Sequence, residues 1–277
     1  MKLGFVGCGN MAGAMMGGII KNNIFKAEDV YGSDVFEPSR ERVKNMYGIH
    51  VSDNNVDVVD AVDVLVLAVK PQYYESVITQ IKDHVRADQL IITIAPGKTL
   101  SWLAEKFGKD VKIVRTMPNT PMKIGLGVCG LYSTPEADPD HRFIVKVFAA
   151  CGDLIWCTKE EELDGVTAIS GSGPAYVFRF IEALTEAGLR YGFNDVQAKR
   201  MAIATVLGSA ELAKRSGESP SVLREKVTSK GGTTYEALKV MNDRHFMEMM
   251  QDAMDACKKR AVELGDAFHE SVEASNK

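Results

Sequence analysis

The chain has 277 residues, of which 45% are hydrophobic and 25% are charged, a composition typical of a globular protein with one large domain or two ordinary ones. A formal net charge of −4 argues against nucleic acid or an anionic membrane as a partner, and no apolar run is long enough to span a bilayer. The five cysteines are odd in number and lack a paired-ligand spacing, and the five histidines are scattered. We therefore expect a cytoplasmic protein with reduced thiols and no metal site.

The first half of the chain alternates short β-branched runs with helical stretches. The expected strands are 2–7, 29–35, 62–69, 89–95 and 111–118, and the expected helices between them are 11–23, 38–48, 73–85 and 100–108. Weaker signals follow for a strand at 127–133, a helix at 138–152 and a strand at 154–157. Nearly continuous Val, Ile and Leu strands between helices predict a doubly wound parallel sheet covered on both faces.

The second half of the chain has a different pattern of expected secondary structure. Strand-like runs disappear after about residue 163, and helical patterns cover 173–192, 194–217 and 242–265. We therefore predict an α/β protein with a dinucleotide-binding domain at 1–162 and an all-helical domain at 163–277. The acidic run 160–162 falls at this boundary, and we interpret it as a solvated link or a helix start.

A glycine-rich turn, Gly7-x-Gly9-x-x-Ala12, lies directly between the first expected strand and the first expected helix. In a dinucleotide site the first glycine permits the tight turn, the second lets backbone approach a pyrophosphate, and the small third residue keeps helix and strand close. The helix N-terminus then offers unpaired N–H groups to the phosphates. The alternative is a tight turn without a ligand, but the flanking strand and helix favour dinucleotide binding.

An acid, Asp34, ends the second expected strand. In this fold a carboxylate there bonds the ribose 2′-OH and repels a 2′-phosphate, which favours NADH. Arg40 and Arg42 follow shortly and could serve a 2′-phosphate, so NADPH stays open. Asp34 could also be an ordinary turn residue.

Small hydroxyl side chains and two glycines gather at 227–238, "VTSKGGTTYEAL", just before a helix-prone run. One interpretation is an ordinary loop with a helix N-cap. The other is a cradle for an anion, because glycines let backbone N–H groups converge and the helix adds the positive end of its dipole.

Five segments, taken together, resemble the pyrroline-5-carboxylate reductases, the last enzymes of proline synthesis. They are "GCGNMAGAM" at 7–15, "LAVKPQ" at 67–72, "RTMPNTP" at 115–121, "AISGSGPAY" at 168–176 and "VTSKGGTTYEALKVM" at 227–241. The resemblance extends to about residue 265. It implies an N-terminal Rossmann domain followed by an all-α dimerisation domain, and a homo-oligomer that is at least a dimer, with a decamer as a possible larger ring.

The resemblance also implies cofactor-binding positions for NADPH or NADH. Asn55 would lie near the adenosine ribose, and Lys70 would serve binding rather than acid catalysis. The full set is Gly7, Cys8, Gly9, Asn10, Met11, Ala12, Ser33, Asp34, Asn55, Ala68, Val69, Lys70, Pro71, Ala95, Pro96, Gly97, Met117, Pro118 and Asn119.

On the substrate side the resemblance implies a grip on the carboxylate of a cyclic imine, with the hydroxyl of Thr234 as the catalytic group near the ring nitrogen. The substrate-binding positions are Ser170, Gly171, Ser172, Ser229, Gly231, Gly232, Thr233 and Thr234. Lys230 departs from the family, where proline is usual.

The expected reaction is hydride transfer from NAD(P)H to Δ1-pyrroline-5-carboxylate, which yields L-proline. One alternative is another reductase of the same build, either a β-hydroxyacid dehydrogenase or a different imine reductase. Such dehydrogenases usually place an acid/base lysine on the helical domain, where this chain offers small hydroxyls. A non-catalytic dinucleotide sensor is the other alternative.

Overall fold

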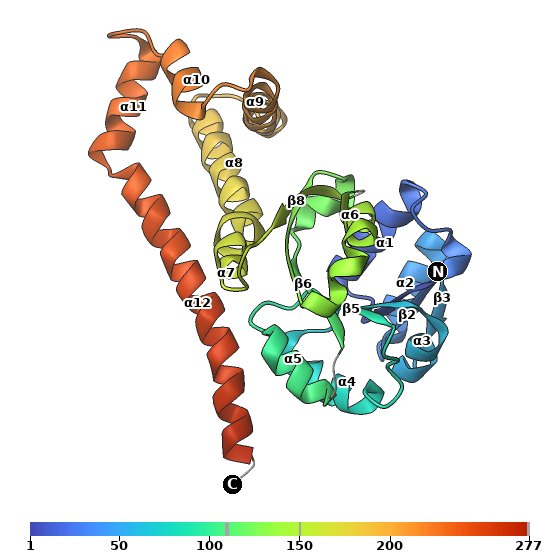
Figure 1. Cartoon of the computed structure of the whole chain (residues 1–277). Helices are drawn as coiled ribbons and strands as arrows, with labels where there is room; N and C mark the ends of the chain where they lie inside the picture. The colour runs from blue at the N-terminus through green and yellow to red at the C-terminus, as the bar shows by residue number, and fades with distance from the viewer. Residues whose placement is uncertain (109–110, 150, 276–277) are drawn as a thin grey trace. The chain divides into compact units, whose positions relative to one another are not determined.

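The computed structural model describes residues 1–108, 111–149 and 151–275. The chain clusters into two compact units (Figure 1). One comprises Met1–Ser172 with the chain from Cys257 onward, and the other is Gly173–Ala256. The first unit contains the sheet, and the second is built from helices. The boundary predicted at 162/163 assigns residues 163–172 to the helical domain, whereas these residues cluster with the sheet.

In the described part of the first unit, eight strands form one sheet in the order β3-β2-β1-β4-β5-β6-β7-β8. Neighbouring strands run parallel except for β6 and β7. The strands are β1 Leu3–Val6, β2 Val30–Ser33, β3 His50–Ser52, β4 Val64–Leu67, β5 Leu90–Thr93, β6 Lys112–Met117, β7 Gly127–Ser133 and β8 Gly152–Trp156. The strand order reverses beside β1, which is where ligands bind in doubly wound sheets.

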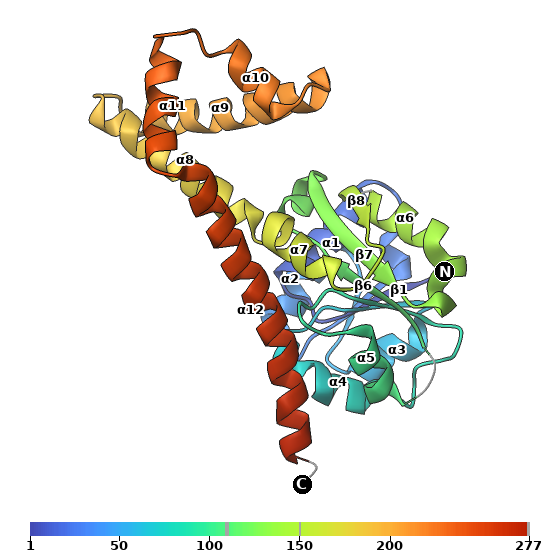
Figure 2. The ribbon, with the colours of Figure 1, turned by 60° about the vertical axis from the view of Figure 1, so that its left-hand side comes forward.

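Helices cover both faces of this sheet (Figure 2). They are α1 Asn10–Lys21, α2 Glu37–Tyr47, α3 Asn55–Ala61, α4 Tyr74–Ile81, α5 Leu100–Phe107, α6 His141–Ala149 and the short α7 Glu162–Val166. Helices α1, α2 and α6 share one hydrophobic core, and α3, α4 and α5 share the other. Successive strand residues alternate between the two cores: Leu3 and Phe5 lie in the first and Val6 in the second. Burial on both faces explains the nearly continuous apolar strands.

Two features of the sheet differ from the prediction. Strand β7 is antiparallel to β6 because only a short 3-10 helix, Thr120–Ile124, separates them, and a parallel crossover needs a dozen or more residues. Strand β3 and helix α3 were not predicted. The strand has three residues, and the helix has seven with an N-cap in which Asn54 accepts from the backbone N–H of Val56. Such short elements carry too few residues for a readable period.

The interpretation of the acidic run as a helix start is confirmed, since α7 begins at Glu162, but Glu160 is not a solvated residue. Its side chain is largely buried, and one carboxylate oxygen accepts hydrogen bonds from Arg115 and from the backbone N–H of Leu100. Glu161 and Glu162 are exposed, as predicted. The sequence pattern cannot separate these neighbours, because the partners of Glu160 lie on β6 and α5, far away in the chain.

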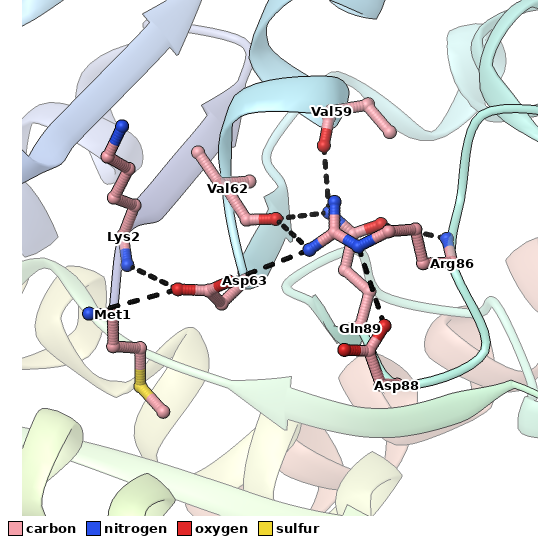
Figure 3. A network of polar contacts seen from close by, with 8 residues as sticks. All are labelled: Met1, Lys2, Val59, Val62, Asp63, Arg86, Asp88 and Gln89. Atoms are coloured by element: carbon pink, nitrogen blue, oxygen red, sulfur yellow. Dashed lines mark hydrogen bonds and ion pairs between the residues drawn. The ribbon is translucent and has the colours of Figure 1, made fainter.

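A polar network closes the amino-terminal edge of the sheet (Figure 3). The buried Gln89 amide donates to the carbonyl oxygens of Val59 and Val62 at 2.9 and 2.8 Å. Arg86 donates to the Val62 carbonyl at 2.9 Å and pairs with Asp63 at 3.6 Å. These residues lie where β4 and β5 begin, opposite the carboxyl edge. The network therefore stabilises the sheet and is not part of the ligand crevice.

The second unit is helical, as predicted. It contains α8 Gly173–Arg190, α9 Asp195–Ser216, α10 Pro220–Lys226, α11 Thr233–Asp243 and the start of α12 Phe246–Ser275. Helix α9 begins with a capping box between Asn194 and Gln197 and ends at Gly217 in a left-handed conformation. Helices α8 and α9 approach closely, since a Cβ on Gly188 would lie 2.8 Å from the Cβ of Ala198. The predicted helices at 173–192 and 194–217 are confirmed, and the helix predicted at 242–265 begins at Phe246, because residues 242–243 end α11.

Candidate functional site

The glycine turn places β1 against β4 at the point where the strand order reverses. Gly7 has a φ of +100°, and a Cβ on it would lie 2.8 Å from the backbone carbonyl carbon and oxygen of Ala68. Its own N–H donates to the carbonyl of Ser33 at 2.7 Å, which joins the end of β2 to the turn. Only glycine fits this position, because both the φ and the contact exclude a side chain.

The N-terminus of α1 has open space for a ligand and backbone N–H groups that can donate hydrogen bonds. The N-cap residue is Gly9, so no side chain caps this end of the helix. A Cβ built on Gly9 would meet nothing within 4 Å. The first turn, Asn10 to Ala12, has N–H groups without an intrahelical acceptor, and the helix dipole adds positive potential there. This open, donor-rich end fits a pyrophosphate, as the sequence predicts for Gly9, Asn10, Met11 and Ala12.

Asp34 is held beside this turn rather than extended into solvent. One carboxylate oxygen accepts the N–H of Cys8 at 2.9 Å, and the other accepts the N–H of Phe36 at 2.9 Å. Arg40 donates to the carbonyl of Asp34 at 2.6 Å, and Arg42 donates to the carbonyl of Cys8 at 2.6 Å. The carboxylate and both guanidinium groups therefore bind the backbone around the expected ribose position.

Ser33 and Asn55, predicted to bind the cofactor, form a buried pair. The Ser33 hydroxyl donates to the Asn55 Oδ1 at 2.8 Å, and the Asn55 amide donates to Gln80 at 2.8 Å. Asn55 is the first residue of α3, and Ser33 ends β2. Both side chains therefore join elements at the carboxyl edge. Their contact with the adenosine ribose stays a prediction.

A buried tyrosine that the sequence did not single out links the ends of β4 and β5. The Tyr74 hydroxyl donates to the carbonyl of Leu67 at 2.6 Å and lies 2.9 Å from the Thr93 Oγ1. Burial raises the pKa of Tyr74. These strand ends lead into the two remaining predicted cofactor segments, Ala68–Pro71 and Ala95–Gly97, so Tyr74 fixes their spacing. Lys70 is exposed in the first segment, and Gly97 has a left-handed φ of +75° in the second.

Two motifs that are far apart in sequence meet at the end of β6. The buried Asn119 donates from its amide nitrogen to the carbonyl of Ser170 at 3.0 Å and accepts the N–H of Val128 at 2.9 Å. A Cβ on Gly171 would lie 2.5 Å from the Met117 Cε. The residues predicted for the nicotinamide side, Met117, Pro118 and Asn119, therefore contact the residues predicted for the substrate side.

Ser170 and Gly171 belong to a π-helical turn, Thr167–Gly171, which continues directly from α7. The turn closes with the Ser172 N–H bonded to the carbonyl of Thr167 at 2.8 Å. The Ser172 hydroxyl accepts from the thiol of Cys257 at 3.2 Å. Single π-turns are rare and occur frequently at functional sites.

The second unit presents the hydroxyl-rich turn at the start of α11. The Gly232 N–H donates to the carbonyl of Ser229 at 3.0 Å, and Gly231 has a φ of +69°. Helix α11 begins at Thr233, with Gly232 as its N-cap and Thr234 as its second residue. A Cβ on Gly232 would lie 2.4 Å from the Ser229 Oγ and 3.1 Å from the Ser229 carbonyl oxygen, so the two residues pack closely. The Gly232 N–H is thus bonded within the turn, and binding of an anion by this segment stays a prediction.

Comparison with known proteins gives matches along nearly the whole chain. Residues 160–264 match a family model for pyrroline-5-carboxylate reductase dimerisation, and residues 2–97 match one for coenzyme F420-dependent NADP oxidoreductases. Reductases named pyrroline-5-carboxylate reductase from Pseudomonas aeruginosa and Escherichia coli are each 34% identical. The match covers 96% of this chain and 97% of the relative in the first case, and 95% and 98% in the second.

The chain belongs to the pyrroline-5-carboxylate reductase family.

Solved structures of the family agree with this assignment. A Plasmodium falciparum pyrroline carboxylate reductase with NADP bound superposes with a TM-score of 0.88 at 32% identity, covering 96% of this chain and 98% of that one. One from Coxiella burnetii gives 0.87 at 34% identity, with 95% and 98% covered. A ketol-acid reductoisomerase from an uncultured archaeon, at 16% identity and a TM-score of 0.63, shares the fold alone.

The cysteines of this family member are all free. Burial raises the pKa of the Cys8 thiol, within the glycine turn, to about 12, so it is a packed side chain rather than a nucleophile. Among the described residues, no cluster of three His, Cys, Asp or Glu side chains could hold a metal ion. Over the same residues, no helix is long and apolar enough to cross a membrane.

Proposed function

We propose that this chain reduces Δ1-pyrroline-5-carboxylate to L-proline, the final step of proline biosynthesis, with NADPH or NADH as the hydride donor. One structural observation supports this reaction for a member of the family. The "MPN" turn after β6 and the "ISGSG" turn after α7 are in direct contact through Asn119 and Ser170, and through Met117 and Gly171. A nicotinamide platform and a substrate-side turn therefore share one place at the carboxyl edge.

The dinucleotide fits the glycine turn on physical grounds. Space above Gly9, an uncapped helix N-terminus and the close approach at Gly7 are what a pyrophosphate requires. When bound, the reduced nicotinamide supplies the hydride. The chain supplies position: Ala95, Pro96 and Gly97 come after β5, and Met117 is the last residue of β6, so both segments border the crevice.

Few side chains are needed for the chemistry itself. A protonated cyclic imine is already a strong electrophile, and orientation alone can lower the barrier by roughly 7–11 kcal/mol. The turn of Ser229, Gly231 and Gly232 is proposed to hold the substrate carboxylate by charge-assisted hydrogen bonds, together with the hydroxyls of Thr233 and Thr234. Thr234 is the proposed donor near the ring nitrogen. Lys230 is exposed and can add positive charge for the carboxylate.

The chain is proposed to act as a homo-oligomer, at least a dimer. The described part of α8 to α11 buries few residues, which are Gly188, Ala198 and Ala202. Large apolar side chains are instead exposed on these helices, among them Phe178 at 59% and Leu207 at 61%. Helices without a core of their own must cover such surfaces with another chain, and the matched dimerisation family points to a second copy. Free cysteines fit the cytoplasm as the proposed compartment.

The deciding experiment follows NADH and NADPH oxidation by absorbance after addition of Δ1-pyrroline-5-carboxylate, with product proline quantified. We expect rapid oxidation with one proline formed per dinucleotide. The control for a dehydrogenase is an assay with a β-hydroxy-acid as the substrate and NAD⁺ or NADP⁺ as the oxidant, in which formation of the reduced dinucleotide is measured. Tight dinucleotide binding without imine-dependent oxidation would refute the proposal and favour the sensor, and turnover of the hydroxy-acid alone would favour the dehydrogenase.

A further inference from the structure

A largely buried ion cluster joins elements that carry the proposed nicotinamide and substrate segments. Arg115, on β6, has a side chain that is 6% exposed. One of its nitrogens lies 2.9 Å from the Glu160 Oε1, and the other lies 3.6 Å from the Asp164 Oδ1. The same Glu160 oxygen accepts the backbone N–H of Leu100 at 2.8 Å. The cluster therefore joins β6, the first residue of α5 and helix α7.

Each of these three elements leads into a different part of the site. Arg115 stands two positions before Met117, which contacts Gly171. Leu100 begins α5 just after the predicted cofactor segment 95–97. Asp164 lies in α7, which continues into the π-turn that carries Ser170. A shift of the cluster would therefore move the segments on both sides of the reacting atoms.

We propose that Arg115, Glu160 and Asp164 are positioning residues, which fix the gap between the nicotinamide segments and the substrate-side π-turn. This inference rests on the proposed function. None of the three is assigned a contact with substrate or cofactor. They act through Leu100, Met117 and Ser170.

Burial and the charges around Asp164 act on its pKa in both directions. Burial raises the pKa of Asp164, Arg115 lowers it, and Glu160 raises it again. Lys258, from α12, lowers this pKa, and Glu161 raises it. The net effect of these groups raises the pKa of Asp164. Buried ion pairs seldom add stability over well-packed apolar side chains, and their best attested benefit is a defined geometry.

The test compares Glu160→Gln and Glu160→Ala with Glu161→Gln, a matched control in the same acidic run whose side chain is exposed. Glutamine keeps an oxygen for the Leu100 N–H but loses the charge opposite Arg115, and alanine loses both. Because a misplacement of about 1 Å can cost roughly a hundredfold in rate, we expect kcat to fall about tenfold for Glu160→Gln and about a hundredfold for Glu160→Ala. KM for the imine and the dinucleotide Kd should change by less than about threefold, since the groups that bind them are intact.

Hydrogen exchange provides a readout that does not depend on turnover. In Glu160→Ala, exchange should rise at 100–103 and at 167–172, while the glycine turn at 7–13 stays as protected as in the parent chain. Wild-type kcat in both Glu160 variants would overturn the proposal. So would a uniform rise in exchange, which would indicate general destabilisation. If the parent chain fails to reduce the imine, the proposed function is refuted. In that case, hydrogen exchange and dinucleotide titration of the Glu160 variants still decide whether the cluster positions 100–103 and 167–172.

Discussion

Replacement of three glycines in and after the first turn separates fold stability from ligand binding. Gly7→Ala places a Cβ at a φ of +100°, 2.8 Å from the Ala68 backbone, which cannot move aside as a flexible side chain would. The backbone conformation costs about 1–2 kcal/mol for a non-glycine residue, and overpacking typically costs about 1–3 kcal/mol. We therefore expect the free energy of unfolding to fall by about 2–5 kcal/mol.

The other two glycines serve as matched controls. Gly13 lies inside α1, and a Cβ there would meet nothing within 4 Å, so Gly13→Ala should stabilise the chain by up to about 1 kcal/mol. Gly9→Ala also enters open space, at an ordinary φ of −67°, and should change stability by less than about 1 kcal/mol. That open space is where the pyrophosphate is proposed to lie, so the dinucleotide Kd should rise at least about tenfold.

Urea unfolding can be followed by the fluorescence of Trp102 and Trp156, which both lie in the sheet unit. Dinucleotide titration of the folded variants gives the Kd values. A Gly7→Ala chain within about 1 kcal/mol of the parent would refute the close approach of β1 to β4. Unchanged dinucleotide affinity in Gly9→Ala would refute the assignment of this turn to the pyrophosphate.

Four further predictions test the site and the sheet. Thr234→Ala should lower kcat about a hundredfold or more at a nearly constant dinucleotide Kd, and Thr234→Ser should restore most of it; an unchanged kcat would remove Thr234 from its role. Asp34→Ser removes the carboxylate held by the Cys8 N–H, so the kcat/KM ratio of NADPH to NADH should rise about tenfold or more, and a constant ratio would count against this position. Gln89→Ala leaves the Val59 carbonyl without its side-chain donor, while the Val62 carbonyl keeps the hydrogen bond from Arg86. The free energy of unfolding should therefore fall by about 1–3 kcal/mol while the dinucleotide Kd holds, and loss of binding instead would contradict the structural role of Gln89. The raised pKa of Asp164 means that the folded chain holds this proton more tightly, so the free energy of unfolding falls as pH rises from about 4 through the raised pKa. Asp164→Asn should flatten this dependence on pH in urea titrations. An unaltered dependence would contradict the shift.

Local patterns were sufficient for much of the fold. Strands such as Val64–Leu67 are apolar throughout because both faces of the sheet are covered. The glycine turn was recognisable because it lies between a strand and a helix. Helix α9 was readable from its period and from the glycine that ends it. The short β3 and α3 were not, because short elements have too little period. The reversed direction of β7 was missed, although the short gap between the expected strands at 111–118 and 127–133 excludes a parallel crossover.

The family resemblance identified the predicted site residues one motif at a time, but not their mutual contacts. Only the folded chain brings Asn119 to Ser170 and Met117 to Gly171, because the two members of each pair are separated by more than 50 residues of sequence. Glu160 is the sharpest case. Three consecutive glutamates are chemically identical in the sequence, and one of them is buried.

The sequence by itself determined the doubly wound architecture, the dinucleotide turn and the helical second half, because period, glycine placement and strand composition are local properties. Tertiary structure alone decided which acids pair with Arg115 and which motifs are in contact. Those outcomes depend on partners brought together by the closing of the sheet, and no local pattern encodes the position of a distant partner.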